Sequence, residues 1–414
     1  MMVEENLQDL YAEKVGIETE FNDNAEGYLE PFDPEKISIE TKKVSMDTCL
    51  RRLQQGTLVL NPDFQRQEVW TLDKKSQLIE SLMLNIPIPM FYVSSDPKGN
   101  YTVVDGLQRL STIRDFVLGQ NFLKEKDIKK REALKGRGFR LQNLEFWRQY
   151  ESMQFVELPE HLYNRILETE FTFTVINPST PEEVKRNIFK RINTGGLPLS
   201  PQEIRNALYG GNSTILLNKL SKMRDFLKAT DNSINSLRME DKEVILRFLA
   251  FTVRSYKYYK RSQNVDDYLA DTMIIINCGG NMSARQIESL VKKSGTAGTG
   301  IVPFSENQLI DKFVVAMSRS YRLFGRHTFR KSHGDNRRSP INKSLFETWG
   351  VLLSEMTLDN FQKLCANKDR MMPDYIKLLD SKEFQQAISR NSMTHQSVKF
   401  RFGRIKELIN NYSR

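Results

Sequence analysis

The stretch Tyr101–Ile113, YTVVDGLQRLSTI, joins an apolar run to a helical pattern through Asp105-Gly106. The aromatic and β-branched residues before Asp105 predict a strand, and the residues after Gly106 predict a helix that ends at Gly119. The start of a helix presents unpaired N–H groups and about half a positive charge, which suits a phosphate. Gly106 lets an anion approach the backbone closely, and the Arg109 guanidinium can bind phosphate through two N–H groups. We therefore predict a phosphate-binding junction at this point of the chain.

A second interpretation of this junction is purely structural. Asp105 as N-cap, with Gln108 three residues later, has the spacing of a capping box, so both side chains would only complete the helix. A carboxylate also repels a phosphate, so in a nucleotide site Asp105 is expected to hold Mg²⁺, orient water or contact a ribose. Ser111 and Thr112 lie in the first turns of the same helix and would add hydroxyl groups to the site.

Asn61–Trp70, NPDFQRQEVW, is a Pro-containing extended stretch that offers Gln65 and Arg66 to a ligand. Arg66 would reach a phosphate, and Gln65 would contact a base, a phosphate or a water molecule. In the alternative interpretation, Trp70 is a core aromatic residue and Arg66 is a surface charge.

A third stretch, FKRINTGGLPLSPQEIRNALYGG at 189–211, places Asn193 and Thr194 before two glycines and a capped helix. Glycines followed by a helix start can form an anion-binding nest of N–H groups. Gly195 would otherwise be only the left-handed C-cap of the preceding helix. We predict that Asn193 and Thr194 form a second wall of the nucleotide site.

The rest of the pattern predicts an α+β chain, with a mixed α/β N-terminal half and a helical C-terminal half. Capping boxes with a Pro at the first helical position start helices at Thr180 and Ser200. Beyond residue 200, strand signals are scarce. Helices are predicted over 45–55, 74–84, 107–118, 146–155, 160–167 and 182–192, strands over 90–94, 101–104 and 170–176, and a loop or insertion over 120–140. The predicted organisation is an acidic leader at 1–35, an α/β domain at 36–195 and a helical domain at 196–414.

The net charge of +9 is unevenly distributed. Residues 1–40 contain twelve acids and two lysines, a net charge of −10, so the rest of the chain carries 59 − 40 = +19. A basic body suggests contact with a polyanion such as nucleic acid or nucleotide, although a merely soluble basic surface masked by the leader is the alternative. The densest basic stretch is 319–338. The residues that we predict to bind nucleic acid there are Arg326, Arg330, Lys331, Arg337 and Arg338. Tyr321, Phe324 and Phe329 would stack on bases, or form the inward face of a helix.

Several classes of protein are excluded by sequence. No apolar run approaches the roughly 18–20 residues that span a bilayer, and the acidic N-terminus is unlike a signal peptide, so we expect a soluble, cytoplasmic protein without membrane contact. The three cysteines are far apart and show neither a disulfide framework nor a zinc motif. Neither a Walker loop nor a GxSxG elbow occurs, and the four histidines show no HExxH spacing.

Four motifs occur in the order of a known family: FQRQEVW at 64–70, KKSQLIESLMLNIPIPMFYV at 74–93, VVDGLQRLSTI at 103–113 and FKRINTGGLPLSPQEIRNAL at 189–208. The chain resembles the DUF262 family, the N-terminal domain of GmrSD-type restriction enzymes, within the ParB/sulfiredoxin-like superfamily. The resemblance implies a ParB-like domain with a small mixed sheet, followed by a mainly helical domain. It also implies a nucleotide-phosphate site at the Asp-Gly-Gln-Gln-Arg signature, which Asp105, Gly106, Gln108 and Arg109 match here, with Leu107 in place of the first Gln.

The family resemblance and the junction together favour an antiviral defence protein that binds and hydrolyses a nucleoside triphosphate with Mg²⁺. Asp105, Gln108 and Arg109 are the predicted catalytic residues. Two alternatives remain open: a non-enzymatic DNA- or partner-binding module, and a metal-dependent DNA nuclease component. The expected partners are a nucleoside triphosphate, DNA, a separate nuclease or defence-system protein, and further copies of the chain.

Overall fold

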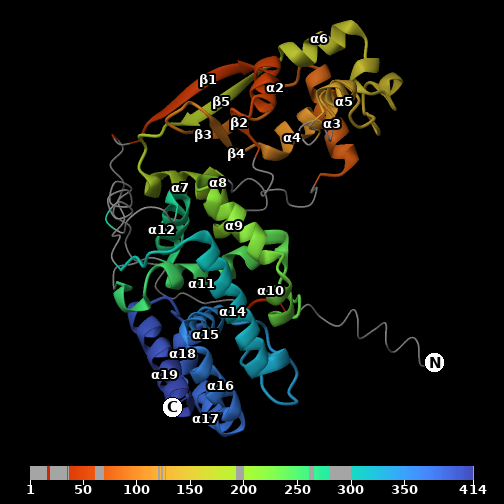
Figure 1. The fold of residues 1–414 in the computed structure, drawn as a ribbon. Helices are drawn as coiled ribbons and strands as arrows, with labels where there is room; N and C mark the ends of the chain where they lie inside the picture. Colours follow the sequence, from red (N-terminus) through yellow and green to blue (C-terminus); the bar gives the residue numbers. More distant parts are fainter. Residues whose placement is uncertain are drawn as a thin grey trace, which may run out of the picture. The chain divides into compact units, whose positions relative to one another are not determined.

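The computed structural model forms two compact units (Figure 1). The α/β unit comprises Pro31–Leu199 and Asn206–Leu208, and the helical unit comprises Met1–Glu30, Ser200–Arg205 and Tyr209–Arg414. The predicted α+β class is confirmed, since a five-stranded mixed sheet with helices precedes a largely helical part. The structure describes residues 16–18, 35, 37–60, 70–119, 122, 125, 127–192, 200–260, 265–279, 285 and 300–413.

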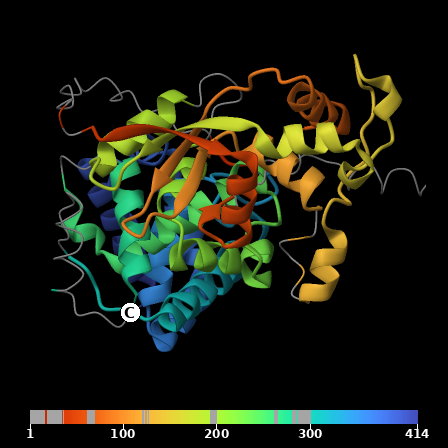
Figure 2. The ribbon, with the colours of Figure 1, turned by 90° about the horizontal axis from the view of Figure 1, so that it is seen from above.

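The sheet of the α/β unit has the strand order β1-β5-β3-β4-β2. Its central strands β3 and β4 form the predicted antiparallel hairpin, and β5 joins β3 in parallel. Figure 2 shows β1 along the edge next to β5, to which it pairs antiparallel, and β2 pairs with β4 in parallel. The strands are β1 Ile39–Ser45, β2 Leu58–Val59, β3 Phe91–Ser95, β4 Tyr101–Asp105 and β5 Glu170–Ile176.

A single apolar core lies between this sheet and four helices. Phe91 of β3 stacks on Phe173 and meets Phe171 edge-on, both from β5. Ser45 and Thr71 cap the first two helices through their hydroxyl oxygens, as expected of N-cap residues. The four helices are α2 Met46–Gln54, α3 Leu72–Met83, α4 Leu107–Val117 and α6 Glu160–Glu168.

The helix predicted over 146–155 is wrong, and the backbone at Ser152 explains why. Ser152 takes a left-handed φ of 65°, and its N–H donates to the Leu141 carbonyl at 2.7 Å, so a helix cannot continue through it. The buried Glu80 carboxylate binds the N–H groups of Phe146 and Trp147 at 2.8 Å, and the backbone that follows forms two short 3₁₀ turns. These turns are η3 Arg148–Tyr150 and η4 Phe155–Glu157.

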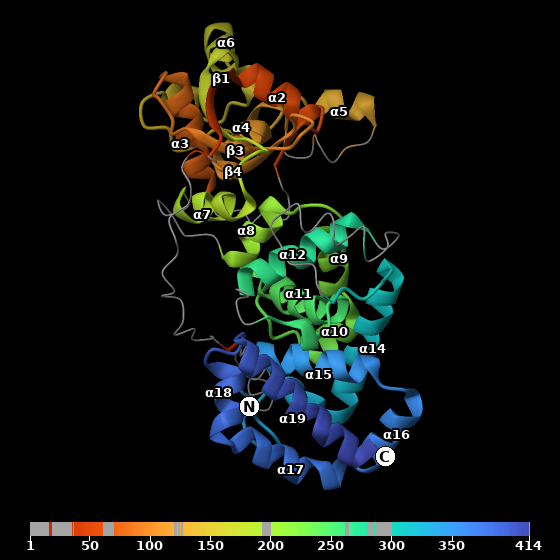
Figure 3. The ribbon, with the colours of Figure 1, turned by 90° about the vertical axis from the view of Figure 1, so that its left-hand side faces the viewer.

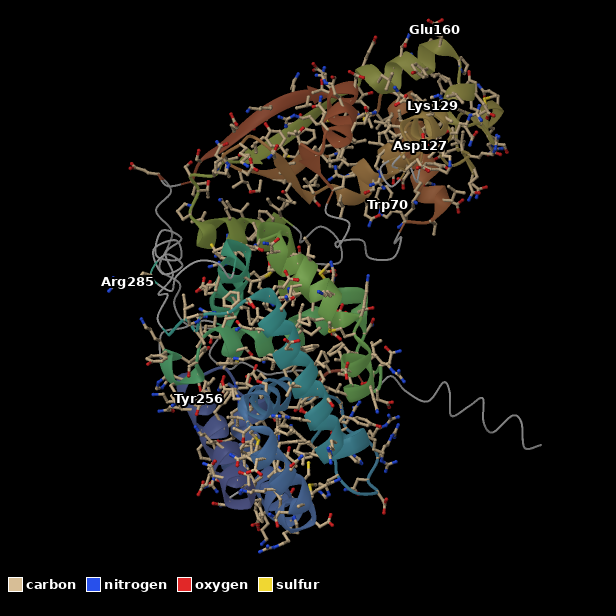
Figure 4. The ribbon with its side chains drawn as sticks, viewed as in Figure 1. Trp70, Asp127, Lys129, Glu160, Tyr256 and Arg285 are labelled. Carbon is tan, nitrogen blue, oxygen red and sulfur yellow. The ribbon has the colours of Figure 1, made fainter. Side chains whose placement is uncertain are left out.

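The segment predicted as a loop at 120–140 contains a short helix, α5 Ile128–Leu134. Asp127, labelled in Figure 4, caps it by accepting the N–H groups of Lys129 and Lys130. The helix was not predicted because this segment, rich in Lys and Arg, has little of the apolar periodicity that identifies a helix. In the last part of the α/β unit, α7 Glu182–Ile192 forms as predicted.

The helical unit begins in α8 Pro201–Leu208, whose predicted capping box has both of its bonds, between Ser200 and Glu203. In Figure 3 the last helices of the chain gather around α19, which packs against α15, α16, α17 and α18. Tyr256, labelled in Figure 4, stacks on Phe402 of α19. The helices are α9 Asn212–Ser221, α10 Arg224–Ala229, α11 Glu240–Val253, α12 Val265–Cys278, α14 Glu306–Phe324, α15 Lys343–Glu355, α16 Leu358–Ala366, α17 Lys368–Asp380, α18 Lys382–Ser389 and α19 His395–Ser413, with 3₁₀ turns η6 Ser236–Arg238, η7 Tyr256–Tyr258 and η8 Gly325–His327.

Buried ion pairs connect the helices of this unit. Glu347 of α15 pairs with Arg401 of α19, and both side chains are fully buried. Arg247 of α11 lies 3.7 Å from the second oxygen of Glu347. Buried charges that lose a partner destabilise a protein strongly, so this set fixes how α11, α15 and α19 pack.

A second acidic residue, Glu243 of α11, extends the set toward α8. Lys343 lies 2.8 Å from its carboxylate, Arg247 lies 3.7 Å away and Arg205 lies 3.9 Å away. Burial by itself would raise the pKa of Glu243, but the three cations outweigh burial and lower the pKa to about 2. The carboxylate is therefore ionised at neutral pH.

Among the helices that the structure describes, none combines the length and the apolar character that a membrane crossing needs.

Candidate functional site

The junction between β4 and α4 has the predicted strand-glycine-helix form. β4 ends at Asp105, and Gly106 takes a left-handed conformation with φ of 92° as the N-cap of α4. The first main-chain bond of the helix joins the Leu110 N–H to the Gly106 carbonyl at 2.9 Å. The amides of Leu107, Gln108 and Arg109 precede this bond, and no side chain caps them among the residues that the structure describes.

The structural alternative for this junction, a capping box of Asp105 and Gln108, is wrong. The N-cap is Gly106, which has no side chain, and the Asp105 carboxylate pairs with Arg109 instead. Gln108 is partly exposed in the first turn. The helix start therefore keeps its unpaired amides and the positive end of its dipole, which are the features that attract an anion.

Gly106 is required by packing as well as by its backbone angle. A Cβ atom built on Gly106 would lie 2.2 Å from Cδ1 of Phe91 and 3.2 Å from Nη2 of Arg109. The first distance is shorter than real Cβ contacts, and the second is tighter than most of them. A larger residue therefore fits only if the Phe91 ring or the start of α4 moves. The close approach of the backbone to Phe91 ties the helix start to the central strand of the sheet.

Arg109 is held by internal acceptors, and it is not the free phosphate-binding side chain that the sequence predicts. Its guanidinium donates to the carbonyls of Pro89 and Met90 and to Asp105 Oδ2, the last at 3.0 Å. It also lies over the ring of Phe91, 4.7 Å from the centroid. Burial lowers the pKa of the guanidinium, and the Asp105 carboxylate acts in the opposite direction. Arg109 therefore positions the junction, joining the entry of β3 to the exit of β4.

The sequence did not identify the carbonyls of Pro89 and Met90, or the ring of Phe91, as parts of this site. The available signal was the Pro-Ile-Pro run before β3, which holds carbonyl groups in an extended backbone and lacks N–H groups at its prolines. Such carbonyls need donors from elsewhere, and Arg109 supplies them for Pro89 and Met90.

The hydroxyl residues of α4 differ in accessibility. Ser111 is partly exposed, whereas Thr112 is 1 % exposed and lies within the core side of the helix. The prediction that Thr112 contacts a nucleotide is therefore wrong. With 3.6 residues per turn of α4, Thr112 lies on the buried face of the helix. The other predicted ligand residues, Gln65, Arg66, Asn193 and Thr194, lie outside the described residues. Trp70, labelled in Figure 4, packs against the core, as its structural interpretation predicted.

A divalent cation would find one carboxylate at the junction. Asp105 is 36 % exposed in its side chain, and one of its oxygens accepts from Arg109. Within the described part of the chain, no group of three or more His, Cys, Asp or Glu residues could hold a metal ion. Mg²⁺ is commonly bound by one or two carboxylates together with substrate phosphates, so Asp105 fits Mg²⁺ only when the phosphates supply further ligands.

Three of the five residues predicted to bind nucleic acid in the 319–338 stretch bind partners within the protein instead. Arg330 is 2 % exposed, and its guanidinium donates to the Ser339 carbonyl and to Ser233 Oγ. Lys331 pairs with Glu18 of the acidic leader, and Arg338 pairs with Asp231. Arg330, Lys331 and Arg338 therefore each bind a partner within the protein.

Arg326 and Arg337 remain exposed. Two of the aromatic residues of this stretch face inward, as their structural interpretation predicted. Phe329 packs on Phe346, and Phe324 packs on Trp349. Phe329 is 2 % exposed, so its ring does not stack on a base, whereas Phe324 is partly exposed.

Residues 48–210 match the family model of the GmrSD restriction endonuclease N-terminal domain. This segment contains β4, Gly106 and the whole of α4, so the junction lies inside the matched domain. The match confirms the predicted resemblance to the DUF262 family over this part of the chain. A domain of this family indicates a component of a restriction-type defence system. A search of curated proteins finds no match to the chain.

Proposed function

We propose that the α/β unit binds the phosphates of a nucleoside triphosphate at the start of α4, within a restriction-type defence system. The observation that carries this proposal is the uncapped first turn behind a left-handed Gly106. Phosphates bind favourably to such a turn because its N–H groups are unpaired and the helix dipole is positive there. The match of residues 48–210 to the GmrSD domain supports the restriction-type context of the proposal.

The residues of the junction would divide the work. The amides of Leu107, Gln108 and Arg109 would bind phosphate oxygens directly. Arg109 is a positioning residue, which holds Asp105 at 3.0 Å. Asp105 would bind Mg²⁺ between itself and the phosphates, and the Gln108 side chain would orient the attacking water. Hydrolysis would then depend on positioning and charge stabilisation, as is typical of phosphoryl transfer.

Asp105→Asn separates the metal from the phosphate in this proposal. Asparagine still offers Arg109 an oxygen acceptor, so the junction should fold, but it lacks the charge that binds Mg²⁺. In a thermal-shift panel of ATP, GTP, CTP and UTP, we expect a nucleotide to raise the midpoint of the wild-type chain, and more so with Mg²⁺. The variant should keep the nucleotide shift and lose the additional shift due to Mg²⁺.

Asp127→Asn is the matched control for this experiment. It removes the same charge from an exposed position of the same unit, and asparagine caps α5 as well as aspartate does. This control should retain the whole Mg²⁺ effect. An equal Mg²⁺ effect in wild type and Asp105→Asn would remove the metal-binding role of Asp105, and the absence of any nucleotide shift in the wild-type chain would remove the proposed function.

A further inference from the structure

Part of the acidic leader pairs with the rest of the helical unit through an isolated β-bridge. The Ile341 N–H donates to the Gly16 carbonyl at 3.0 Å, and the Glu18 N–H donates to the Ile341 carbonyl at 2.9 Å. Ile17 is thus paired in parallel with Ile341, which also pairs with Arg330 on its other side. This is the geometry of strand addition, in which main-chain bonds hold an extended peptide in one register.

The Glu18 side chain completes the contact through both carboxylate oxygens. Lys331 Nζ lies 2.5 Å from Oε1, and Asn342 Nδ2 donates to Oε2 at 3.0 Å. Lys331 Nζ also donates to Ser389 Oγ at 2.6 Å. Glu18 is 24 % exposed and Lys331 is 30 % exposed, so the carboxylate is partly removed from water and bound by a charge and by an amide.

The groups that donate hydrogen bonds to the Glu18 carboxylate are held in place by the rest of the helical unit. Asn342 is 1 % exposed, its Oδ1 caps α15 at Leu345, and its Nδ2 also donates to the Ile388 carbonyl. These bonds leave the amide one orientation, with Nδ2 toward Glu18. Asn342 would keep that orientation if the leader departed, because neither its cap nor its Ile388 bond involves the leader.

The loop that carries Lys331 is equally well held. Ser339 Oγ accepts the N–H groups of Lys331 and Ser332, and Ser332 Oγ accepts the N–H of Ser339. Buried Arg330 anchors the same loop to Ser233. A site whose donors are held in place before the ligand arrives loses less free energy on binding.

We infer that Lys331, Asn342, Ser389 and the Ile341 backbone form a peptide-binding slot for an extended segment that carries a carboxylate side chain. The leader segment Gly16-Ile17-Glu18 is its resident occupant. The surrounding leader is suited to this basic part of the chain, since residues 1–40 carry a net charge of −10 and the rest carries +19. The slot recognises its peptide by register through Ile341 and by charge through Lys331.

The occupancy of the slot is tested in the full chain with a labelled peptide of residues 10–24. A covalently attached leader competes at an effective concentration on the order of millimolar, so the wild-type chain should exclude the free peptide. Glu18→Lys places a cation against Lys331 and should open the slot. We expect the labelled peptide to bind the Glu18→Lys chain at least about tenfold more tightly than the wild-type chain, by fluorescence anisotropy.

A charge swap shows whether recognition depends on the named pair. A peptide that itself carries Glu18→Lys should not bind the Glu18→Lys chain. In the double variant Glu18→Lys/Lys331→Glu the leader regains an opposite charge, so the slot should close again and exclude a peptide carrying Glu18→Lys. Glu40→Lys is the matched control, since it makes the same charge change on β1 of the α/β unit and should exclude the wild-type peptide as the wild-type chain does.

Hydrogen exchange of the Ile341 amide provides an independent readout. It should exchange at least about tenfold faster in Glu18→Lys than in wild type, and regain its protection in the double variant or when the free peptide is added. Equal peptide binding by the wild-type and Glu18→Lys chains, no binding to either, or unchanged exchange of Ile341 would each overturn the inference.

Discussion

Gly106→Ala is expected to destabilise the α/β unit by roughly 2–5 kcal/mol and to abolish nucleotide binding. An alanine in the left-handed region loses about 1–2 kcal/mol, and overpacking a well-filled core adds about 1–3 kcal/mol. The second contribution arises because the new methyl group would lie 2.2 Å from the Phe91 ring. Relief of that overlap moves either the buried Phe91 ring or the start of α4, and movement of the helix start displaces the amides that are proposed to bind phosphate.

Gly99→Ala isolates the contribution of the overlap. Gly99 has a φ of 80°, close to the 92° of Gly106, but a Cβ atom there meets nothing within 4 Å. This control should lose about 1–2 kcal/mol and bind nucleotide normally. The free energy of unfolding of this unit is measured by urea titration, with hydrogen exchange of peptides from β3 and β4 as the readout. Nucleotide binding is measured by calorimetric titration. Equal losses of stability in the two variants would contradict the packing role of Phe91.

Arg401→Met is expected to have the largest effect on the helical unit, a loss of about 3–5 kcal/mol, as for other buried ion pairs that lose one partner. Glu347 and Arg401 are both fully buried. Methionine fills much of the same volume but removes the guanidinium that pairs with the buried Glu347 carboxylate, while Arg247 stays 3.7 Å from its second oxygen. The variant also removes the donor to the Ser392 carbonyl.

Arg404→Met makes the same change on the exposed face of α19. Arg404 pairs with Glu407 at 2.8 Å, but the two side chains are 49 % and 57 % exposed, and exposed pairs contribute about 1 kcal/mol at most. Urea unfolding followed through the exchange of α15 amides compares the two variants. Similar losses would show that the buried pair does not stabilise the packing of α15 against α19.

The elements that were predicted correctly are those whose signal is local. The capping box at Ser200, the hairpin of β3 and β4, and the helix after Gly106 each depend on residues close in sequence. β1 was missed because it is an edge strand with mostly exposed residues, so its pattern lacks the apolar alternation that identifies a strand. The helix predicted over 146–155 does not form because Ser152 takes a left-handed φ of 65° and its N–H bonds to the Leu141 carbonyl, which the local sequence pattern does not reveal.

The junction was located from sequence, but the role of its arginine was not. A guanidinium near a helix start can bind either a phosphate or carbonyl groups. Only the fold brings the carbonyls of Pro89 and Met90 within reach of Arg109, so the sequence could not distinguish the two roles. The basic stretch shows the same difficulty. Charge counts do not reveal that Arg330 is buried or that Glu18, more than three hundred residues away in sequence, binds Lys331.

The central claim is that phosphates bind the first amides of α4, and the amide resonances of Leu107, Gln108 and Arg109 report on this directly. We predict that the nucleotide with the largest thermal shift, added with Mg²⁺, moves these three resonances in the ¹H–¹⁵N spectrum of the full chain in proportion to site occupancy. Saturating nucleotide that leaves all three resonances in place, while resonances elsewhere move, would contradict the account.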